Sequence, residues 1–103
     1  MISLTALYPK TADSHFDMDY YLHTHTFLVR ERLTPIGLVS IDLEAGLAGG
    51  VSDSLPACAM IGRLNFASLD ELQNALSAHG PELIGDIPKF TDVQPLMQIS
   101  QSV

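Results

Sequence analysis

The sequence has little of several residue types, and each shortage narrows what the protein can be. It contains no tryptophan, one cysteine, and 5 basic residues against 12 acidic ones. A formal net charge of −7 cannot neutralise a phosphate backbone or an anionic membrane surface, so we expect no nucleic-acid or membrane partner. No apolar run approaches the length of a bilayer span. The lone Cys58 cannot form an internal disulfide, and together these features favour the cytoplasm.

The residues that are present are typical of a small folded domain. The 103 residues are 47% hydrophobic and 17% charged, which is a globular composition. Folding a chain of this size buries about two thirds of the surface that the unfolded chain exposes, enough for one thin, two-layer core. We therefore expect a single domain over residues 1–103. The first eight residues alternate in polarity and carry no basic segment, which predicts a strand and not a signal peptide.

The first half of the sequence predicts a strand, a helix and a second strand. Apolar residues at every second position indicate a strand over residues 2–8, which Pro9 ends. Asp17 offers an N-cap to a helix from Met18 to about Leu33. The apolar face of this helix is predicted to comprise Met18, Tyr21, Leu22, His25, Leu28 and Val29. Alternation returns over residues 36–44 and indicates the second strand.

Two further strands are expected in the second half. A loop rich in Gly and Ser over about 46–56 leads to a third strand over 57–66. The last strand is predicted over about 93–100. Because Pro95 cannot donate to a backbone ladder, this last strand belongs at the edge of a sheet.

A second helix is predicted between these two strands. Ser68 and Glu71 have the spacing of a capping box, with a hydroxyl at the cap and a carboxylate three residues later. Gly80 followed by Pro81 is expected to close the helix. One further turn is expected over residues 82–87.

Strand, helix, strand, strand, helix, strand is the order of a split β-α-β fold. It predicts an α+β, ferredoxin-like domain in which both helices cover one face of a four-stranded antiparallel sheet. The third strand is apolar on both sides: Met60, Leu64 and Phe66 alternate with Ala57, Ala59 and Ile61. A large exposed apolar face marks an interface. We therefore expect a homodimer in which two subunits pack sheet to sheet, the alternative being a monomer with an open sheet.

Several short motifs run in order along nearly the whole chain. They are Tyr8 with Pro9, Phe16 with Asp17, Tyr20 with Tyr21, Thr24 with His25, Leu28 with Val29, and the segments 46–50 and 86–100. This set resembles the EthD family, named for a protein of ethyl tert-butyl ether degradation. The resemblance implies a dimeric α+β barrel, a fold shared with cofactor-free monooxygenases, muconolactone isomerase-like enzymes, polyketide cyclases and haem-dependent relatives. Because so broad a fold does not assign a reaction, it implies only an oxidoreductase-associated, small-molecule role.

One position departs from the family pattern. The family usually has a proline after the Thr-His-x triplet, where this chain has Phe27. A proline there would bend the helix, whereas Phe27 lets it run straight. We expect Phe27 to point outward, away from His25.

His25 is the first candidate for chemistry. It lies on the predicted apolar helix face, between Tyr21 and Val29, so its ring would point between helix and sheet. A neutral imidazole in such a place can accept or donate a proton near pH 7. The alternative is a core histidine satisfied by a single hydrogen-bond partner.

Five other residues are expected near His25. Tyr21 could orient a ligand through its hydroxyl, the alternative being a buried tyrosine whose hydroxyl is already hydrogen-bonded. Asp92 is the expected acidic partner of the histidine, although it could equally be an ordinary turn residue. Tyr8 and Phe90 are expected at the mouth of a cleft, with Leu22 contributing apolar lining.

Metal and phosphate sites are not expected. His23 and His25 are two residues apart and diverge by 200° on a helix, so they cannot share one ion. The 46–50 segment lacks the GxGxxG spacing and leads into a strand. Cys58 has no cationic neighbour in the sequence and is expected to be an inert buried thiol. Haem is suggested by fold analogy alone, so no cofactor is predicted.

Three functional hypotheses remain. The first is a cofactor-independent, oxidoreductase-like, isomerase-like or cyclase-like enzyme acting on a small apolar organic molecule, with His25, Tyr21 and Asp92 as catalytic residues. The second is a non-catalytic protein that binds a hydrophobic metabolite or serves an oxidative degradation system. The third is a filled core with no pocket larger than a few waters.

Overall fold

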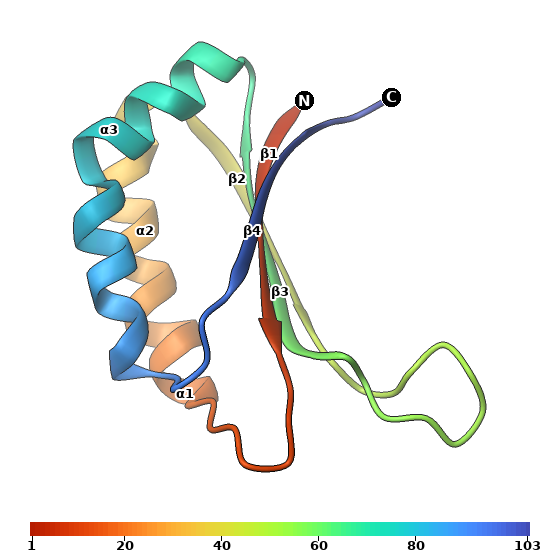
Figure 1. Cartoon of the computed structure of the whole chain (residues 1–103). Helices are drawn as coiled ribbons and strands as arrows, with labels where there is room; N and C mark the ends of the chain where they lie inside the picture. Colours follow the sequence, from red (N-terminus) through yellow and green to blue (C-terminus); the bar gives the residue numbers. More distant parts are fainter.

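The computed structural model describes residues 1–103 and shows a sheet with helices packed on one face (Figure 1). The elements are β1 (Ile2–Pro9), α1 (Met18–Tyr20), the π-helical turn η1 (Tyr21–His25), α2 (Thr26–Leu33), the 3-10 turn η2 (Thr34–Ile36), β2 (Leu38–Ala45), β3 (Cys58–Phe66), α3 (Leu69–Asp86), the 3-10 turn η3 (Ile87–Lys89) and β4 (Leu96–Gln101). The sheet order is β2-β3-β1-β4, and every neighbouring pair is antiparallel. The predicted ferredoxin-like α+β fold is confirmed, and so is the edge position of the last strand.

The sheet face beneath the helices carries two clusters of buried side chains. The aliphatic cluster consists of Val29, Leu33, Leu38, Phe66, Leu72, Ala75 and Leu83. The aromatic cluster consists of Tyr8, Tyr21, Met60, Ile87 and Phe90, with Phe16 and Tyr20 packed against it. Ile2 packs on the first cluster and Tyr8 belongs to the second, so the two clusters lie toward opposite ends of β1. Their burial, at about 25 cal/mol per Å² of apolar surface, holds the helices on the sheet.

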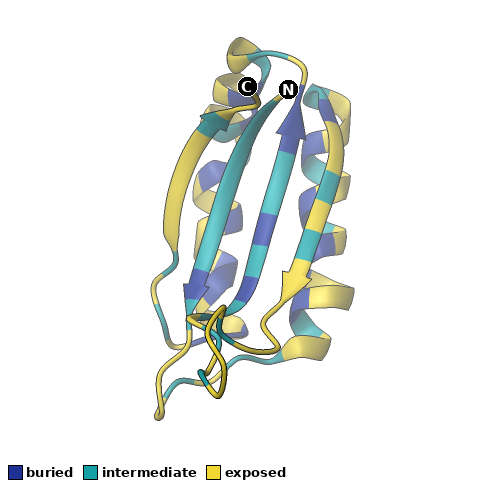
Figure 2. Cartoon of the chain, turned by 90° about the vertical axis from the view of Figure 1, so that its right-hand side faces the viewer, coloured by how far each residue is buried: buried dark blue, intermediate teal, exposed yellow.

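Figure 2 shows the opposite face of the sheet, on which most of the outward-pointing residues are polar by their position in the register. Its outward residues form three rows across β2, β3, β1 and β4: Ser40, Asn65, Ser3, Ser100; then Asp42, Arg63, Thr5, Gln98; then Glu44, Ile61, Leu7, Leu96. In the first row the Ser3 hydroxyl donates to Asn65 Oδ1 at 2.6 Å. The expectation of a bare apolar second face is therefore wrong for two of the three rows. In these rows β3 is apolar on its outward side only at Ile61, because Arg63 and Asn65 are polar, and β1 and β2 also turn mostly polar residues outward.

The first helical segment, which comprises α1, η1 and α2 over residues 18–33, contains a widened turn that the sequence did not predict. Asp17 caps it as expected, accepting from the Tyr20 backbone N–H at 3.1 Å. Over η1 the hydrogen bonds span five residues, and the Thr26 hydroxyl also donates to the Tyr21 carbonyl at 2.8 Å. The extra residue in this turn rotates the positions around it relative to a regular wheel. Consequently Met18 and Leu22, expected on the buried face, are 36% and 37% exposed.

Phe27 follows the widened turn and points to solvent, with 62% of its surface exposed. The predicted outward direction is confirmed. The segment continues into α2 without a proline kink, although it is not a regular α-helix throughout because of η1.

Helix α3 begins as predicted and ends later than predicted. The Ser68 hydroxyl accepts from the Glu71 backbone N–H, as expected for the N-cap, and it donates to the Glu71 carboxylate at 3.1 Å. Pro81 does not close the helix, which continues to Asp86. The carbonyl that Pro81 leaves unpaired belongs to the exposed Ser77, where water can replace the lost hydrogen bond. Buried Leu83 then fixes the last turns against the core.

The remaining connections lie at the end of the sheet away from the chain termini (Figure 1). The segment joining β2 and β3 extends beyond the sheet on the side away from the helices. It carries three strongly exposed apolar side chains, Leu47, Val51 and Leu55. β4 starts at Leu96, so Pro95 precedes the strand instead of lying within it. None of the helices has the length and apolar character needed to cross a membrane.

Candidate functional site

A hollow of about 80 Å³ lies between the helices and the sheet, where the two clusters meet. Thirteen of its 17 lining residues are hydrophobic. They come from every layer: Leu4, Ala6 and Tyr8 of β1, Ile41 and Leu43 of β2, Gly62 and Leu64 of β3, Met97 of β4, Tyr21, His25, Thr26 and Val29 of the first helical segment, and Leu76, Gly80, Leu83, Ile84 and Ile87 of α3 and η3. The hollow exceeds the 10–15 Å³ or so that one water needs and is smaller than the roughly 300–1,000 Å³ of pockets for drug-sized ligands.

The hollow opens between α3 and β4. Ile84 and Met97 line it and also line the two shallower grooves outside, one on either side of this gap. Both side chains are partly exposed, at 54% and 42%. A bound molecule would therefore enter past an apolar rim.

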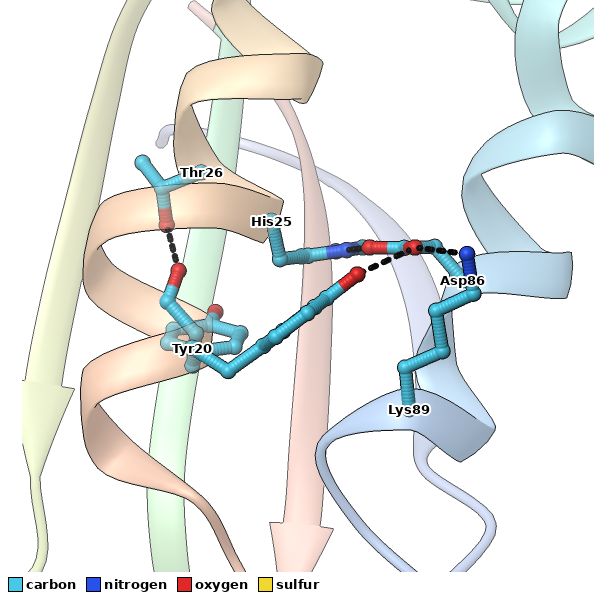
Figure 3. Close-up of polar contacts among 6 residues, drawn as sticks. Tyr20, His25, Thr26, Asp86 and Lys89 are labelled. Carbon is cyan, nitrogen blue, oxygen red and sulfur yellow. Dashed lines mark hydrogen bonds and ion pairs between the residues drawn. The ribbon is translucent and has the colours of Figure 1, made fainter.

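His25 is the histidine of the first candidate site, and it lines the hollow among mostly apolar residues. It is only 7% exposed, and its Nδ1 lies 2.9 Å from Oδ2 of Asp86, whose side chain is equally buried (Figure 3). Because a carboxylate only accepts, Nδ1 of the ring is the donor, and whenever the ring is neutral Nε2 carries the lone pair. No group of the chain is hydrogen-bonded to Nε2. Because no fully enclosed side-chain nitrogen lacks a partner, this atom keeps some accessible surface.

Asp86 collects further contacts. The Tyr20 hydroxyl donates to its Oδ1 at 2.8 Å, and Lys89 Nζ lies 3.7 Å from the same oxygen (Figure 3). Burial raises the pKa of the Asp86 carboxyl, but the hydrogen bonds from His25 and Tyr20 and the charges of His25 and Lys89 outweigh it. The pKa therefore lies below its ordinary value of 3.8. The carboxylate also ends α3, where negative charge is unfavourable because of the helix dipole.

Tyr8 and Tyr21 border the hollow beside His25. Their rings lie 5.6 Å apart, edge to face, and both residues are almost fully buried. Burial raises the pKa of Tyr21 to about 12 and also raises the pKa of Tyr8, to which the nearby Tyr21 adds. Neither hydroxyl is hydrogen-bonded within the chain, and no fully enclosed side-chain oxygen lacks a partner. Both oxygens therefore keep some accessible surface, in residues that line the hollow. Both phenols are protonated donors at neutral pH.

Glycine at position 62 makes room for the Tyr21 hydroxyl. A Cβ at Gly62 would lie 2.5 Å from that oxygen, which is too close for a normal contact. The hydroxyl therefore lies over β3, on the floor of the hollow.

Aromatic rings hold His25 in place. Tyr21 stacks on it at 5.6 Å, and Phe90 packs at 4.7 Å. Phe90 is fully buried and lies behind the imidazole, bordering the outer groove instead of the hollow. Its expected place at a cleft mouth is thus only partly correct.

The structure brings together some of the residues that the sequence predicted and separates others. Tyr8, Tyr21 and His25 meet at one hollow. Leu22 does not line it, because η1 turns that side chain outward. Asp92 is not the partner of His25: it is exposed, and its Oδ1 accepts from the His15 backbone N–H at 2.8 Å. That contact is the turn role left open as its alternative.

Asp86 and Tyr20 were missed as site residues. Asp86 was missed because the predicted helix ends at Gly80, so the sequence did not indicate which way the Asp86 side chain points. Both nevertheless belong to the motifs that carried the family resemblance, which is the signal that could have identified them.

No three side chains of His, Cys, Asp or Glu lie close enough together to hold a metal ion. His23 is exposed on the far side of the helix from His25. Cys58, expected to be buried, is half-buried at the start of β3. What the site offers is therefore acid–base chemistry: an oriented imidazole and two phenol donors in an apolar setting.

Comparisons with known proteins agree with this fold. A scan against protein-family models found no match, and a search of curated proteins found none either. Among solved structures, an EthD-like protein from Ralstonia eutropha JMP134 is 34% identical, over 97% of this chain and 89% of that one, with a TM-score of 0.89. An EthD family protein from Bacillus halodurans C-125 is 20% identical over 100% and 99%, with a TM-score of 0.77. A structure described as an antibiotic biosynthesis monooxygenase is 14% identical over 100% and 99%, with a TM-score of 0.51, and shares the fold alone.

Proposed function

Because this chain belongs to the EthD family, we propose that it binds a small, mostly apolar organic molecule in the hollow and removes a proton from it without a cofactor. One observation carries this proposal: a buried imidazole, His25, held by a buried carboxylate, borders an otherwise apolar cavity. A carboxylate on Nδ1 fixes the ring and stabilises the imidazolium that proton removal creates, as it does in hydrolase triads. Oxidation, isomerisation and cyclisation of such a molecule can each begin with removal of a proton. The proposal therefore covers three reaction classes: oxidoreductase-like, isomerase-like and cyclase-like.

The size of the hollow limits the ligand. About 80 Å³ accommodates a small group or one end of a longer molecule, the remainder leaving between α3 and β4. The exposed apolar side chains of Ile84 and Met97 at this opening suit a hydrocarbon remainder.

Filling the hollow tests whether binding occurs there. Ala6→Val adds two methyl groups to the lining of the hollow, while Ala59→Val makes the same substitution outside it, in the same sheet. We expect benzene to raise the unfolding temperature of the wild type and of Ala59→Val, because a ligand that binds only the folded state stabilises it. Ala6→Val should respond much less. Equal responses from both variants would remove the hollow from the proposal.

A second candidate is a non-catalytic carrier of a hydrophobic metabolite. The largely apolar lining, which needs no chemistry to hold such a molecule, favours it. His25→Gln separates the two: a carrier keeps its ligand affinity and loses no function, whereas an enzyme keeps affinity and loses turnover. Unchanged turnover of an identified substrate would remove His25 from the mechanism.

We further propose that two copies associate through the outward row Ile61, Leu7 and Leu96, together with the exposed loop residues Leu47, Val51 and Leu55. The row and the loop lie at the same end of the outer sheet face (Figure 2). Leu96→Asp, at a site that is 64% exposed, should dissociate the dimer in sedimentation experiments. Gln98→Asp, in the neighbouring polar row of β4, should leave it intact. A cytoplasmic setting and a single domain remain predictions from the sequence.

A further inference from the structure

Three polar groups of the hollow lack a hydrogen-bond partner in the chain, and together they suggest what the ligand carries. They are the hydroxyls of Tyr8 and Tyr21 and Nε2 of His25. The Tyr20 hydroxyl differs from these three groups, because it already donates a hydrogen bond to Asp86. Buried polar groups are nearly always hydrogen-bonded in folded proteins, so unpaired ones that face a cavity indicate groups kept for a ligand.

The three groups differ in what they can exchange. The two phenols stay protonated at neutral pH and donate, because burial raises the pKa of each. In the neutral imidazole Nε2 of His25 accepts, because the single ring proton lies on Nδ1 and is donated to Asp86. The hollow therefore offers a ligand two hydrogen-bond donors, the Tyr8 and Tyr21 hydroxyls, which suit an oxygen atom. It also offers one acceptor, Nε2 of His25, which can take up a proton.

The charge of the lining excludes acids. No Lys or Arg borders the hollow, and the nearest cation, Lys89, lies beyond Asp86 with its side chain 66% exposed. A carboxylate or phosphate would be buried there without a counter-ion, which is strongly unfavourable. A neutral oxygen, such as that of a carbonyl group, is the kind that two phenols can hold.

We propose that the hollow binds a neutral ketone or aldehyde with a hydrogen on the carbon next to the carbonyl, and that the protein converts it reversibly to its enolate. This inference rests on the proposed function and narrows its ligand. The C–H bond breaks and its proton passes to Nε2 of His25. The bond's electron pair forms a carbon–carbon double bond, while the carbonyl π pair moves to the oxygen. That oxygen, now negative, accepts hydrogen bonds from Tyr8 and Tyr21, and the imidazolium is stabilised by Asp86.

Cyclohexanone in D₂O tests the step without the natural substrate. Each passage through the enolate returns a deuteron from solvent, so the ¹H NMR signal of the hydrogens next to the carbonyl decays. We expect the wild type to accelerate this decay well above buffer. His25→Gln should lower the protein-dependent rate by about 10²–10⁴-fold, as expected for loss of a general base. Tyr21→Phe should lower it by about 10²–10³-fold, as expected for loss of one oxyanion donor.

Gly62→Ala tests the position of the Tyr21 hydroxyl without removing any of the side chains that take part in the proposed step. Its added methyl would displace the Tyr21 hydroxyl, which it approaches to 2.5 Å, so exchange should fall while cyclohexanone binding persists. Gly85→Ala is the control, because its methyl meets nothing within 4 Å and the residue does not line the hollow. The unfolding temperature of each variant confirms that it is folded. Exchange that is insensitive to Tyr8→Phe, Tyr21→Phe and Gly62→Ala would overturn the role of the phenols.

Comparison with cyclohexane separates this inference from the proposed function. Preferential binding of the ketone, with exchange, supports both. Equal binding of ketone and hydrocarbon, with exchange no faster than in buffer, overturns the inference and leaves a hydrophobic binding protein. Failure of cyclohexanone, cyclohexane and benzene to bind at all would overturn both.

Discussion

The two clusters beneath the helices are made from different side chains and do different things. The aliphatic cluster contains one aromatic ring, Phe66, and is closed by fully buried Leu33 and Leu72. The aromatic cluster contains or contacts all three tyrosines of the chain, and beside it lie the buried His25 and Asp86. The aliphatic cluster thus stabilises the fold, whereas burial of polar groups beside the aromatic cluster costs free energy.

The hollow lies between these clusters, with its apolar lining drawn from both and its titratable groups from the aromatic end only. This division explains how a small domain can bury several polar groups beneath its helices. The free energy that polar burial costs at one end is offset by well-packed aliphatic side chains at the other. If the division is correct, substitutions at the two ends should affect different properties.

The largest expected effect is on stability at the aliphatic end. Leu72→Ala removes a fully buried side chain and should lower the free energy of unfolding by about 2–5 kcal/mol in urea titrations. Leu55→Ala, at a residue that is 85% exposed, should change it by less than about 0.5 kcal/mol. A loss at Leu72 no greater than that at Leu55 would contradict the assignment of stability to this cluster.

A smaller and pH-dependent effect is expected from Asp86→Asn at the aromatic end. Loss of the charged acceptor should cost about 1–3 kcal/mol at pH 7. Since the folded pKa of Asp86 is depressed, its contribution is present above the ordinary value of 3.8 and is lost as the pH falls through the folded value. Urea unfolding of wild type and variant should therefore converge once the pH falls below the folded pKa of Asp86. Asp13→Asn, in an exposed loop, is the matched control, and a gap that does not depend on pH would refute the linkage.

The smallest effect at neutral pH concerns tyrosine ionisation. The pKa of each of the three tyrosines is raised above 10.0, that of Tyr21 to about 12. Groups with raised folded pKa values contribute stability below the unfolded value and lose it as the pH rises through the folded one. Phenolate absorbance should thus be nearly absent from the folded protein at pH 10 and should appear near pH 10 in urea. A full phenolate signal from folded protein at that pH would show that the aromatic cluster is open to water.

Much of the fold was predictable because it follows from local periodicity. Period-two alternation in β1 and the Ser68 cap of α3 depend on neighbouring residues only, and both are confirmed. The extended end of α3 was not predictable in this way, because continuation past Pro81 depends on the burial of Leu83 against the distant strands.

The candidate site was predictable in part for the same reason. His25 and Tyr21 are four residues apart, so they share a helix face in either a regular or a widened turn. Leu22 was misplaced because the wheel assumed 100° per residue throughout η1. Asp86 lies 61 residues from His25, and only the packing of α3 beside the first helical segment reveals the pair.

The most direct measurement is the ¹⁵N NMR spectrum of the His25 ring, recorded with and without benzene. We expect a proton on Nδ1, where Asp86 holds it, and an Nε2 whose chemical shift in the neutral ring changes when benzene enters the hollow. A ring protonated at Nε2 instead, or an Nε2 shift that benzene leaves unchanged while the protein binds it, would contradict the account.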